Sequence, residues 1–209
     1  IMVTDQGLKR NPELGAKVDQ AVFPRLQGGP HMNAIAGIAI ALKETQTVRF
    51  KKYAAQIVKN SEAIAQELLR HDYKLVAGGT NTHLILIDLS NKGLLGNTAA
   101  EALEAANIVL NRNSVPNDPN PPFYPSGIRM GTPGITTRGM GTREMKIIAR
   151  CIHAVIEDVA SIKKQKEVGF DQEKKASVRQ ELIKASKVVK ETQKTIKELC
   201  KRYPLPKVY

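Results

Sequence analysis

The segment from Gly127 to Pro133, GIRMGTP, most constrains what this chain can fold into. Its first four residues predict a short strand, and the glycines on both sides of Arg129 favour tight turns and close backbone approach. Arginine carries a planar fork of donors that binds a carboxylate through two parallel hydrogen bonds. A strand that presents such an arginine between glycines therefore indicates a site for a small carboxylic acid.

Strand patterns and helical patterns alternate along the chain, which predicts an α/β fold. Three short segments are predicted as strands: the apolar runs 84–87 and 108–110, and the glycine-bounded segment 127–130. Between the first two, a helix over 99–106 should begin at Thr98, with Glu101 completing a capping box. A loop rich in proline and asparagine separates the last two strands.

Longer amphipathic patterns predict three further helices, over 32–70, 143–163 and 171–202. The last of these carries an apolar residue every three or four positions, which is typical of a helix packed on a core or a partner. The first thirty residues predict a short strand, a polar turn, a helix with Asn11 as candidate cap, and a loop from Phe23 to Pro30.

Composition narrows the classes of protein. The net charge is +12, and most of the excess lies after residue 162, where 14 residues are basic and 6 are acidic. This segment has few aromatic residues to stack on bases, so a solvated helix face explains its charge better than a nucleic-acid site does. The two cysteines form neither a disulfide framework nor a zinc motif, and no apolar run reaches the ~20 residues of a membrane span. We therefore expect a cytoplasmic protein without a metal site.

The beginning of the chain suggests a portion of a longer protein. Ile1 is not an initiator residue, and the apolar start IMV is typical of a strand entered part-way. We expect the chain to lack a preceding segment.

Three motifs in one order carry a resemblance to a known family. They are QGGPH at 27–31, GGT at 78–80, and NSVPND at 113–118 followed by SGIRMGTP at 126–133, with TTRG at 136–139 behind them. Together they resemble serine hydroxymethyltransferase over essentially the whole chain. The resemblance implies a fold-type-I pyridoxal-phosphate-dependent transferase. It implies the end of the large cofactor-binding domain at 1–35, a long connecting helix at 36–72 and a small C-terminal α/β domain at 73–209.

The resemblance also implies an activity. The family transfers the hydroxymethyl carbon of serine to tetrahydrofolate and produces glycine and 5,10-methylenetetrahydrofolate, with pyridoxal 5'-phosphate as an electron sink. Its cofactor lysine lies in a Thr-His-Lys-Thr segment that is expected shortly before Ile1. No catalytic residue is therefore expected in this chain, which should be inactive alone. The implied partners are the N-terminal part of the same enzyme and a second subunit that shares the active site.

Individual residues take roles from the matched motifs. Arg129 would hold the carboxylate of the amino acid, and Gly28 and Gly29 would reach the cofactor phosphate of the neighbouring subunit through their backbone. Asn113 would form hydrogen bonds to the pterin, because an amide offers both a donor and an acceptor.

Other matched residues leave more than one role open. Pro121, Pro122 and Phe123 would border the folate, although the proline pair fits a rigid connector equally well. Arg138 supports the site or forms a structural ion pair. His31 belongs to the matched loop, where packing is the alternative to a supporting role.

Two other classes of function remain open. A non-catalytic remnant of the fold could act as a binding or assembly module, with the Lys-rich tail as its contact surface. Another pyridoxal-phosphate enzyme, such as an aldolase for threonine, is a further alternative, but the 113–123 folate loop argues against it.

Overall fold

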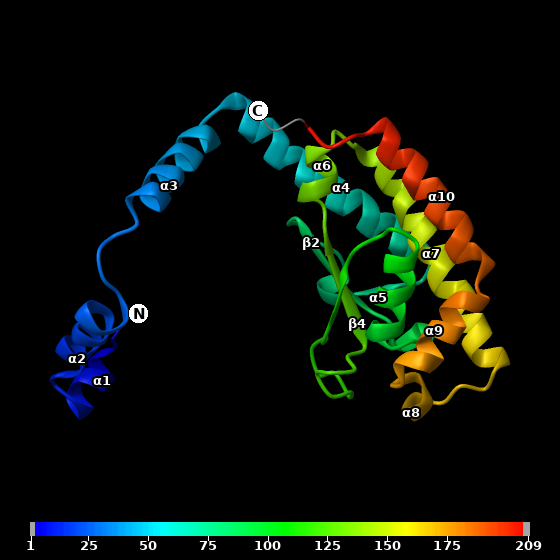
Figure 1. Ribbon diagram of the computed structural model, residues 1–209, viewed down its shortest axis with the longest axis horizontal. Helices are drawn as coiled ribbons and strands as arrows, with labels where there is room; N and C mark the ends of the chain where they lie inside the picture. The colour runs from blue at the N-terminus through cyan, green and yellow to red at the C-terminus, as the bar shows by residue number, and fades with distance from the viewer. Residues whose placement is uncertain (1–2, 207–209) are drawn as a thin grey trace. The chain divides into compact units, whose positions relative to one another are not determined.

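The computed structural model describes residues 3–206, which fall into two compact units that are described separately. The N-terminal unit comprises residues 1–47 and the C-terminal unit comprises residues 48–209 (Figure 1). Within the described part of the chain, no helix combines the length and the apolar character that a membrane crossing requires.

The N-terminal unit is helical from Asp5. Helix α1 (Asp5–Arg10) replaces the predicted polar turn, because the Thr4 side chain accepts a hydrogen bond from the Gly7 amide at 3.2 Å and caps the helix. The expected initial strand is wrong at Val3, which has no regular structure, and its first two residues lie outside the described range.

The predicted helix after Asn11 is confirmed as α2 (Leu14–Gln20). The predicted loop begins later than expected, because Ala21–Leu26 forms a helical turn that is interrupted at Phe23, whose backbone is extended. From Gln27 to Pro30 the chain is irregular, as predicted.

The predicted helix over 32–70 is two helices, α3 (Met32–Thr45) and α4 (Val48–Arg70). At the break, the Thr45 hydroxyl donates to the Leu42 carbonyl and the Thr47 hydroxyl donates to the Glu44 carbonyl, each at 2.7 Å. Such local bonds from threonine compete with helix continuation. The break coincides with the boundary between the two units.

The C-terminal unit is built on a four-stranded antiparallel sheet in the order β1-β2-β4-β3. Its strands are β1 (Lys74–Leu75), β2 (Leu84–Asp88), β3 (Asn111–Asn113) and β4 (Gly127–Gly131). The predicted strands at 84–87 and 127–130 are confirmed. The predicted strand at 108–110 is wrong, since Ile108 donates to the Leu103 carbonyl at the end of a helix and pairing starts only at Asn111.

Helix α5 (Gly96–Ala105) starts before Thr98, so the predicted capping box is wrong. The cap comes instead from Glu173, far along the chain. The Leu95 amide donates to Glu173 Oε1 at 2.9 Å, and the Thr98 hydroxyl donates to the same oxygen at 2.5 Å. A carboxylate at a helix N-terminus satisfies free amides and complements the helix dipole.

Helix α7 (Thr142–Gln165) is confirmed, but the predicted last helix is divided into three. They are α8 (Phe170–Glu173), α9 (Ala176–Ala185) and α10 (Lys187–Arg202). The chain turns at Ser186, whose hydroxyl donates to Asp158 Oδ2 in α7 at 2.5 Å and accepts from the Val189 amide at 3.1 Å. This double contact starts α10 and fixes it to α7.

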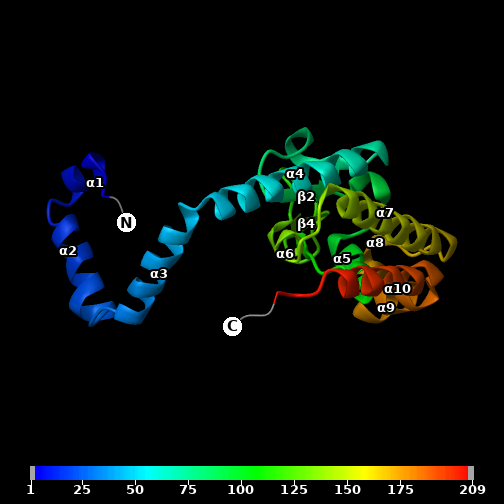
Figure 2. The ribbon, with the colours of Figure 1, turned by 90° about the horizontal axis from the view of Figure 1, so that it is seen from above.

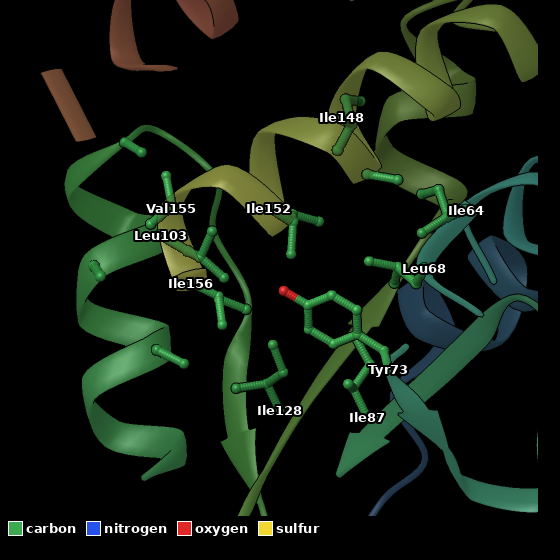
Figure 3. Close-up of a cluster of buried hydrophobic side chains, with 14 of the residues drawn as sticks. Ile64, Leu68, Tyr73, Ile87, Leu103, Ile128, Ile148, Ile152, Val155 and Ile156 are labelled. Carbon is green, nitrogen blue, oxygen red and sulfur yellow. The ribbon is translucent and has the colours of Figure 1, made fainter. Parts of the chain in front are cut away.

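The core lies between one face of the sheet and the helices α4, α5, α7 and α10 (Figures 1 and 2). Ile85, Ile87 and Ile128 point into it from neighbouring strands. In Figure 3 the ring of Tyr73 lies among aliphatic side chains that include Ile87, Ile128 and Ile152. Its buried hydroxyl has no hydrogen-bond partner among the described residues, and burial raises its pKa well above the usual value. A helix-covered sheet of this kind confirms the expected α/β fold class.

Candidate functional site

The face of the sheet that points away from this core carries the polar residues of interest. Arg129 pairs with Leu86 of β2 on one side and with Asn111 of β3 on the other, and Asn113 pairs with Gly127. Side chains two residues apart on a strand share a face, and opposite residues on paired strands do so too. The structure therefore brings Arg129 and Asn113 together on one face, as the sequence interpretation requires.

Arg129 is exposed, and its guanidinium takes part in no hydrogen bond or ion pair among the described residues. Other arginines of the same unit are engaged. Arg150 binds Glu67 at 2.7 Å, and Arg179 binds Glu101 at 2.7 Å. The unpaired guanidinium of Arg129 is thus available to a carboxylate from outside the chain.

Gly127, two residues before Arg129, lies where the fold leaves no room for a side chain. A Cβ at Gly127 would lie 2.6 Å from Val115 Cγ1 and 2.7 Å from the Ile87 carbonyl oxygen. Gly127 is buried, and the Gly96 backbone also packs against its carbonyl. The missing side chain of Gly127 therefore makes room for the neighbouring chain segments.

Asp118 organises the loop between β3 and β4. Its carboxylate accepts hydrogen bonds from the amides of Val115 (3.2 Å), Asn120 (3.0 Å) and Ser126 (2.9 Å), and from the Ser126 hydroxyl (2.6 Å). Burial acts to raise the pKa of Asp118, but these four bonds outweigh it and hold the pKa below its usual value. The sequence interpretation missed this role, although an Asn-Asp-Pro turn signal was present.

The loop held by Asp118 presents the predicted folate residues. Pro121, Pro122 and Phe123 are exposed, and the Phe123 side chain is 78% exposed. The Tyr124 amide donates to the Pro121 carbonyl at 2.8 Å, and Asn97 Nδ2 donates to the Phe123 carbonyl at 3.2 Å. The backbone of Pro121–Phe123, the wall of the site, is therefore fixed, while the ring of Phe123 remains exposed.

Asn113 stands half-buried at the end of β3. Its Nδ2 donates to the Ser114 carbonyl at 2.7 Å, and this contact orients the amide. The Oδ1 atom has no partner among the described residues, so it remains free to accept a hydrogen bond.

Arg138 is half-buried and directly follows the short helix Pro133–Thr137. Its Nη2 donates to the Cys200 carbonyl at 3.0 Å, near the C-terminus of α10, and its buried Nε has no partner among the described residues. A cation at the end of a helix interacts favourably with the last carbonyl groups. This contact supports a structural role that joins α10 to the segment after β4.

Gly28, Gly29 and His31 lie in the N-terminal unit, in the irregular segment before α3. All three are exposed, and the His31 side chain makes no capping bond. The amides of both glycines donate no hydrogen bond among the described residues, and nothing lies within 4 Å of a Cβ built at either position. Bare amides of this kind can bind an anion.

The fold is α/β, and an arginine without a hydrogen bond or ion pair among the described residues stands on the open face of its sheet. The family model for serine hydroxymethyltransferase matches residues 1–152. The family match assigns the chain to a class, the fold-type-I pyridoxal-phosphate transferases. The chain belongs to the serine hydroxymethyltransferase family.

Curated relatives agree with this assignment. The chain is 48% identical over 151 residues to a serine hydroxymethyltransferase of Dichelobacter nodosus, covering 72% of this chain and 36% of the relative. It is 52% identical over 146 residues to that of Desulfotalea psychrophila, covering 70% and 34%. It is 47% identical over 189 residues to that of Acidothermus cellulolyticus, covering 90% and 40%. The chain thus spans less than half of the length of these relatives.

Proposed function

We propose that the protein to which this chain belongs is a serine hydroxymethyltransferase that transfers the hydroxymethyl carbon of serine reversibly to tetrahydrofolate. The observation that carries the proposal is the free guanidinium of Arg129 on the same sheet face as Asn113. The names of the relatives support it.

In this proposal Arg129 binds the carboxylate of serine or glycine through two parallel hydrogen bonds. A fixed carboxylate sets the orientation of the bond that is broken, which is a large part of what a protein contributes beside a cofactor. Pyridoxal 5'-phosphate, when bound, supplies the electron sink for that bond cleavage. The cofactor lysine and the acid–base residues are assigned to the rest of the enzyme, outside this chain.

The second substrate is assigned to the loop between β3 and β4. The free Oδ1 of Asn113 accepts a hydrogen bond from the pterin, and the exposed ring of Phe123 offers it an apolar face. Pro121 and Pro122 stiffen this wall. The four hydrogen bonds of Asp118 hold the loop in shape before the folate arrives.

The remaining assignments concern the assembly of subunits and domains. Gly28 and Gly29 donate their amides to the cofactor phosphate of a neighbouring subunit, so the active site requires a homo-oligomer. We assign the enzyme to the cytoplasm. The chain supplies the end of a large domain at 1–35, a long connecting helical segment at 36–72 and a small domain at 73–209. His31 belongs to the cofactor loop, and Arg138 has a structural role through the Cys200 carbonyl.

The test replaces Arg129 by lysine in the complete enzyme and measures serine–glycine interconversion. Lysine keeps the charge but cannot form the bidentate contact, so kcat/KM for serine should fall about 10- to 100-fold, the effect of losing a charged hydrogen bond. Arg112→Lys is the matched control, because Arg112 is an exposed arginine on β3 that is directly opposite Ile128, on the other face of the sheet.

Wild-type kinetics in Arg129→Lys would refute the assignment. A complete, folded protein that binds neither pyridoxal 5'-phosphate nor tetrahydrofolate would favour the non-catalytic alternative instead.

A further inference from the structure

The strand that carries Arg129 is paired on both sides only as far as Arg129 itself. β3 pairs with Gly127–Arg129, whereas Met130 and Gly131 pair with β2 alone. The next residue, Thr132, then anchors the strand end. Its amide donates to the His83 carbonyl at 3.1 Å.

The Thr132 side chain makes a second anchor, to a different element. Thr132 is fully buried, and its hydroxyl donates to the Ile57 carbonyl in α4 at 2.8 Å. A hydroxyl without a partner is unfavourable in a core, so a buried threonine is retained where it makes such a bond. Thr132 therefore links the end of β4 directly to the backbone of α4.

The segment after Thr132 is fastened to the same helix. Helix α6 (Pro133–Thr137) lies beside α4 at the end of β4 (Figure 1). The Thr136 hydroxyl donates to the Thr132 carbonyl at 2.7 Å and accepts from Asn60 Nδ2 at 2.8 Å. Asn60 also donates to the Met140 carbonyl at 2.9 Å and is fully buried.

Another bond holds Asn60 in this orientation. Gln56 Nε2 donates to Asn60 Oδ1 at 2.8 Å. On the next turn of α4, the Tyr53 hydroxyl lies 2.8 Å from the Thr137 hydroxyl. Residues from three successive turns of α4 thus fix the backbone that follows Arg129.

We propose that Thr132 is a positioning residue for Arg129, which it holds at the place where the amino-acid carboxylate binds. This inference rests on the proposed function and deepens it. Arg129 itself is exposed, and its side chain has no hydrogen bond or ion pair among the described residues, so we assign its placement to the strand backbone. β3 does not pair with β4 beyond Arg129. The two hydrogen bonds of Thr132 therefore fix the position of the strand backbone close to Arg129.

A positioning role and a purely structural role of Thr132 predict different effects on stability and on the reaction rate. Losing one neutral hydrogen bond costs only about 1 kcal/mol of stability. A shift of ~1 Å in a substrate-binding group can reduce the reaction rate by a much larger factor. Thr132→Val, which keeps the shape of the side chain and removes the hydroxyl, should therefore affect serine use more than folding.

The experiment uses the complete enzyme and compares three variants. Thr132→Val should raise the KM for serine and the Kd for glycine, measured by calorimetry, about tenfold. The KM for tetrahydrofolate should stay within about twofold, because the folate wall is held by Asp118 instead. Thr132→Ser, which retains the hydroxyl, should restore the serine KM. Thr98→Val is the matched control, since Thr98 is also a fully buried, hydrogen-bonded threonine but lies in α5.

The inference fails if Thr132→Val leaves the serine KM unchanged while Arg129→Lys raises it, and the proposed function survives that result. It also fails if the KM values for serine and tetrahydrofolate rise together, or if Thr132→Ser behaves like Thr132→Val. An unchanged serine KM in Arg129→Lys would overturn both the inference and the proposed function. If Thr132→Val does not fold, Thr136→Val removes the next bond of the same network and is held to the same outcomes.

Discussion

At the scale of single residues, the site combines polar atoms that have no hydrogen-bond partner with a carboxylate that accepts several hydrogen bonds. The guanidinium of Arg129 and Oδ1 of Asn113 have no partner among the described residues, whereas the Asp118 carboxylate accepts four hydrogen bonds. The free atoms are those proposed to meet substrates. The Asp118 carboxylate fixes the loop between β3 and β4.

Asp118→Asn should loosen the loop from 114 to 126. An amide has one acceptor oxygen instead of two, so at least one of the bonds to Ser126, Asn120 or Val115 is lost, at a cost of about 1–3 kcal/mol. We expect the KM for tetrahydrofolate to rise while the KM for serine changes little. Steady-state kinetics of the complete enzyme measure both. Asp171→Asn is the control, because Asp171 is exposed and, within residues 3–206, forms its ion pair with Lys174 on the surface.

An unchanged KM for tetrahydrofolate in a folded Asp118→Asn variant would contradict this role of the loop.

At the scale of elements, α5 depends on a residue that the local sequence does not contain. Glu173 is fully buried, caps the helix through the Leu95 amide and the Thr98 hydroxyl, and forms an ion pair with Lys163 at 2.5 Å. One side chain therefore joins α8, α5 and α7.

Glu173→Gln should destabilise the C-terminal unit strongly. It leaves the Lys163 ammonium without its counter-ion and weakens the cap, and breaking a buried pair from one side costs about 3–5 kcal/mol. Thermal unfolding measures the loss as a lower Tm. Glu198→Gln, in the exposed pair with Lys201, should leave the Tm unchanged. Equal Tm values for the two variants would show that Glu173 has no special role.

The sequence predicted elements where a local pattern decides and failed where a distant contact decides. The apolar run at 84–87 and the glycine-bounded segment at 127–130 were enough to find β2 and β4. The capping box at Thr98 was wrong because Glu173 takes its place, and the long helix before 202 breaks where Ser186 bonds to Asp158. Motifs located Arg129 and Asn113, but no local signal marks Thr132 as an anchor, since its partner Ile57 is 75 residues away.

At the scale of the whole molecule, three titrating groups predict how stability depends on pH. Bonding and ion pairing with Arg150 hold the pKa of Glu67 below its usual value, against the effect of burial. Burial and the stacked His71 ring, whose centroid lies 4.0 Å away, lower the pKa of His153. The pKa of Asp118 is also lowered.

All three shifts act in the same direction. Each group binds protons more readily in the unfolded chain, so protonation favours unfolding and stability rises with pH. The contribution of His153 is present above its unfolded pKa of about 6.5 and is lost as the pH falls below it. The contributions of Glu67 and Asp118 are present above about 4.5 and are lost as the pH falls further, through their folded pKa values.

We therefore expect the free energy of unfolding to decrease in two steps on acidification, the first from His153 and the second from the carboxylates. Urea titrations between about pH 7 and pH 3 measure it. His153→Gln should remove the first step and leave the second. A stability that increases on acidification below pH ~6.5 would contradict the assignment.

The cap on α5 has a consequence for exchanging parts between relatives. The family model ends at residue 152, yet the carboxylate that starts α5 stands at Glu173, and Arg179 beyond it binds Glu101 on the same helix. A chimaera joined at the end of the matched region would inherit one half of each contact from either parent. Such hybrids should fold well only when the parent that supplies the C-terminal part has an acid and an arginine at these two positions.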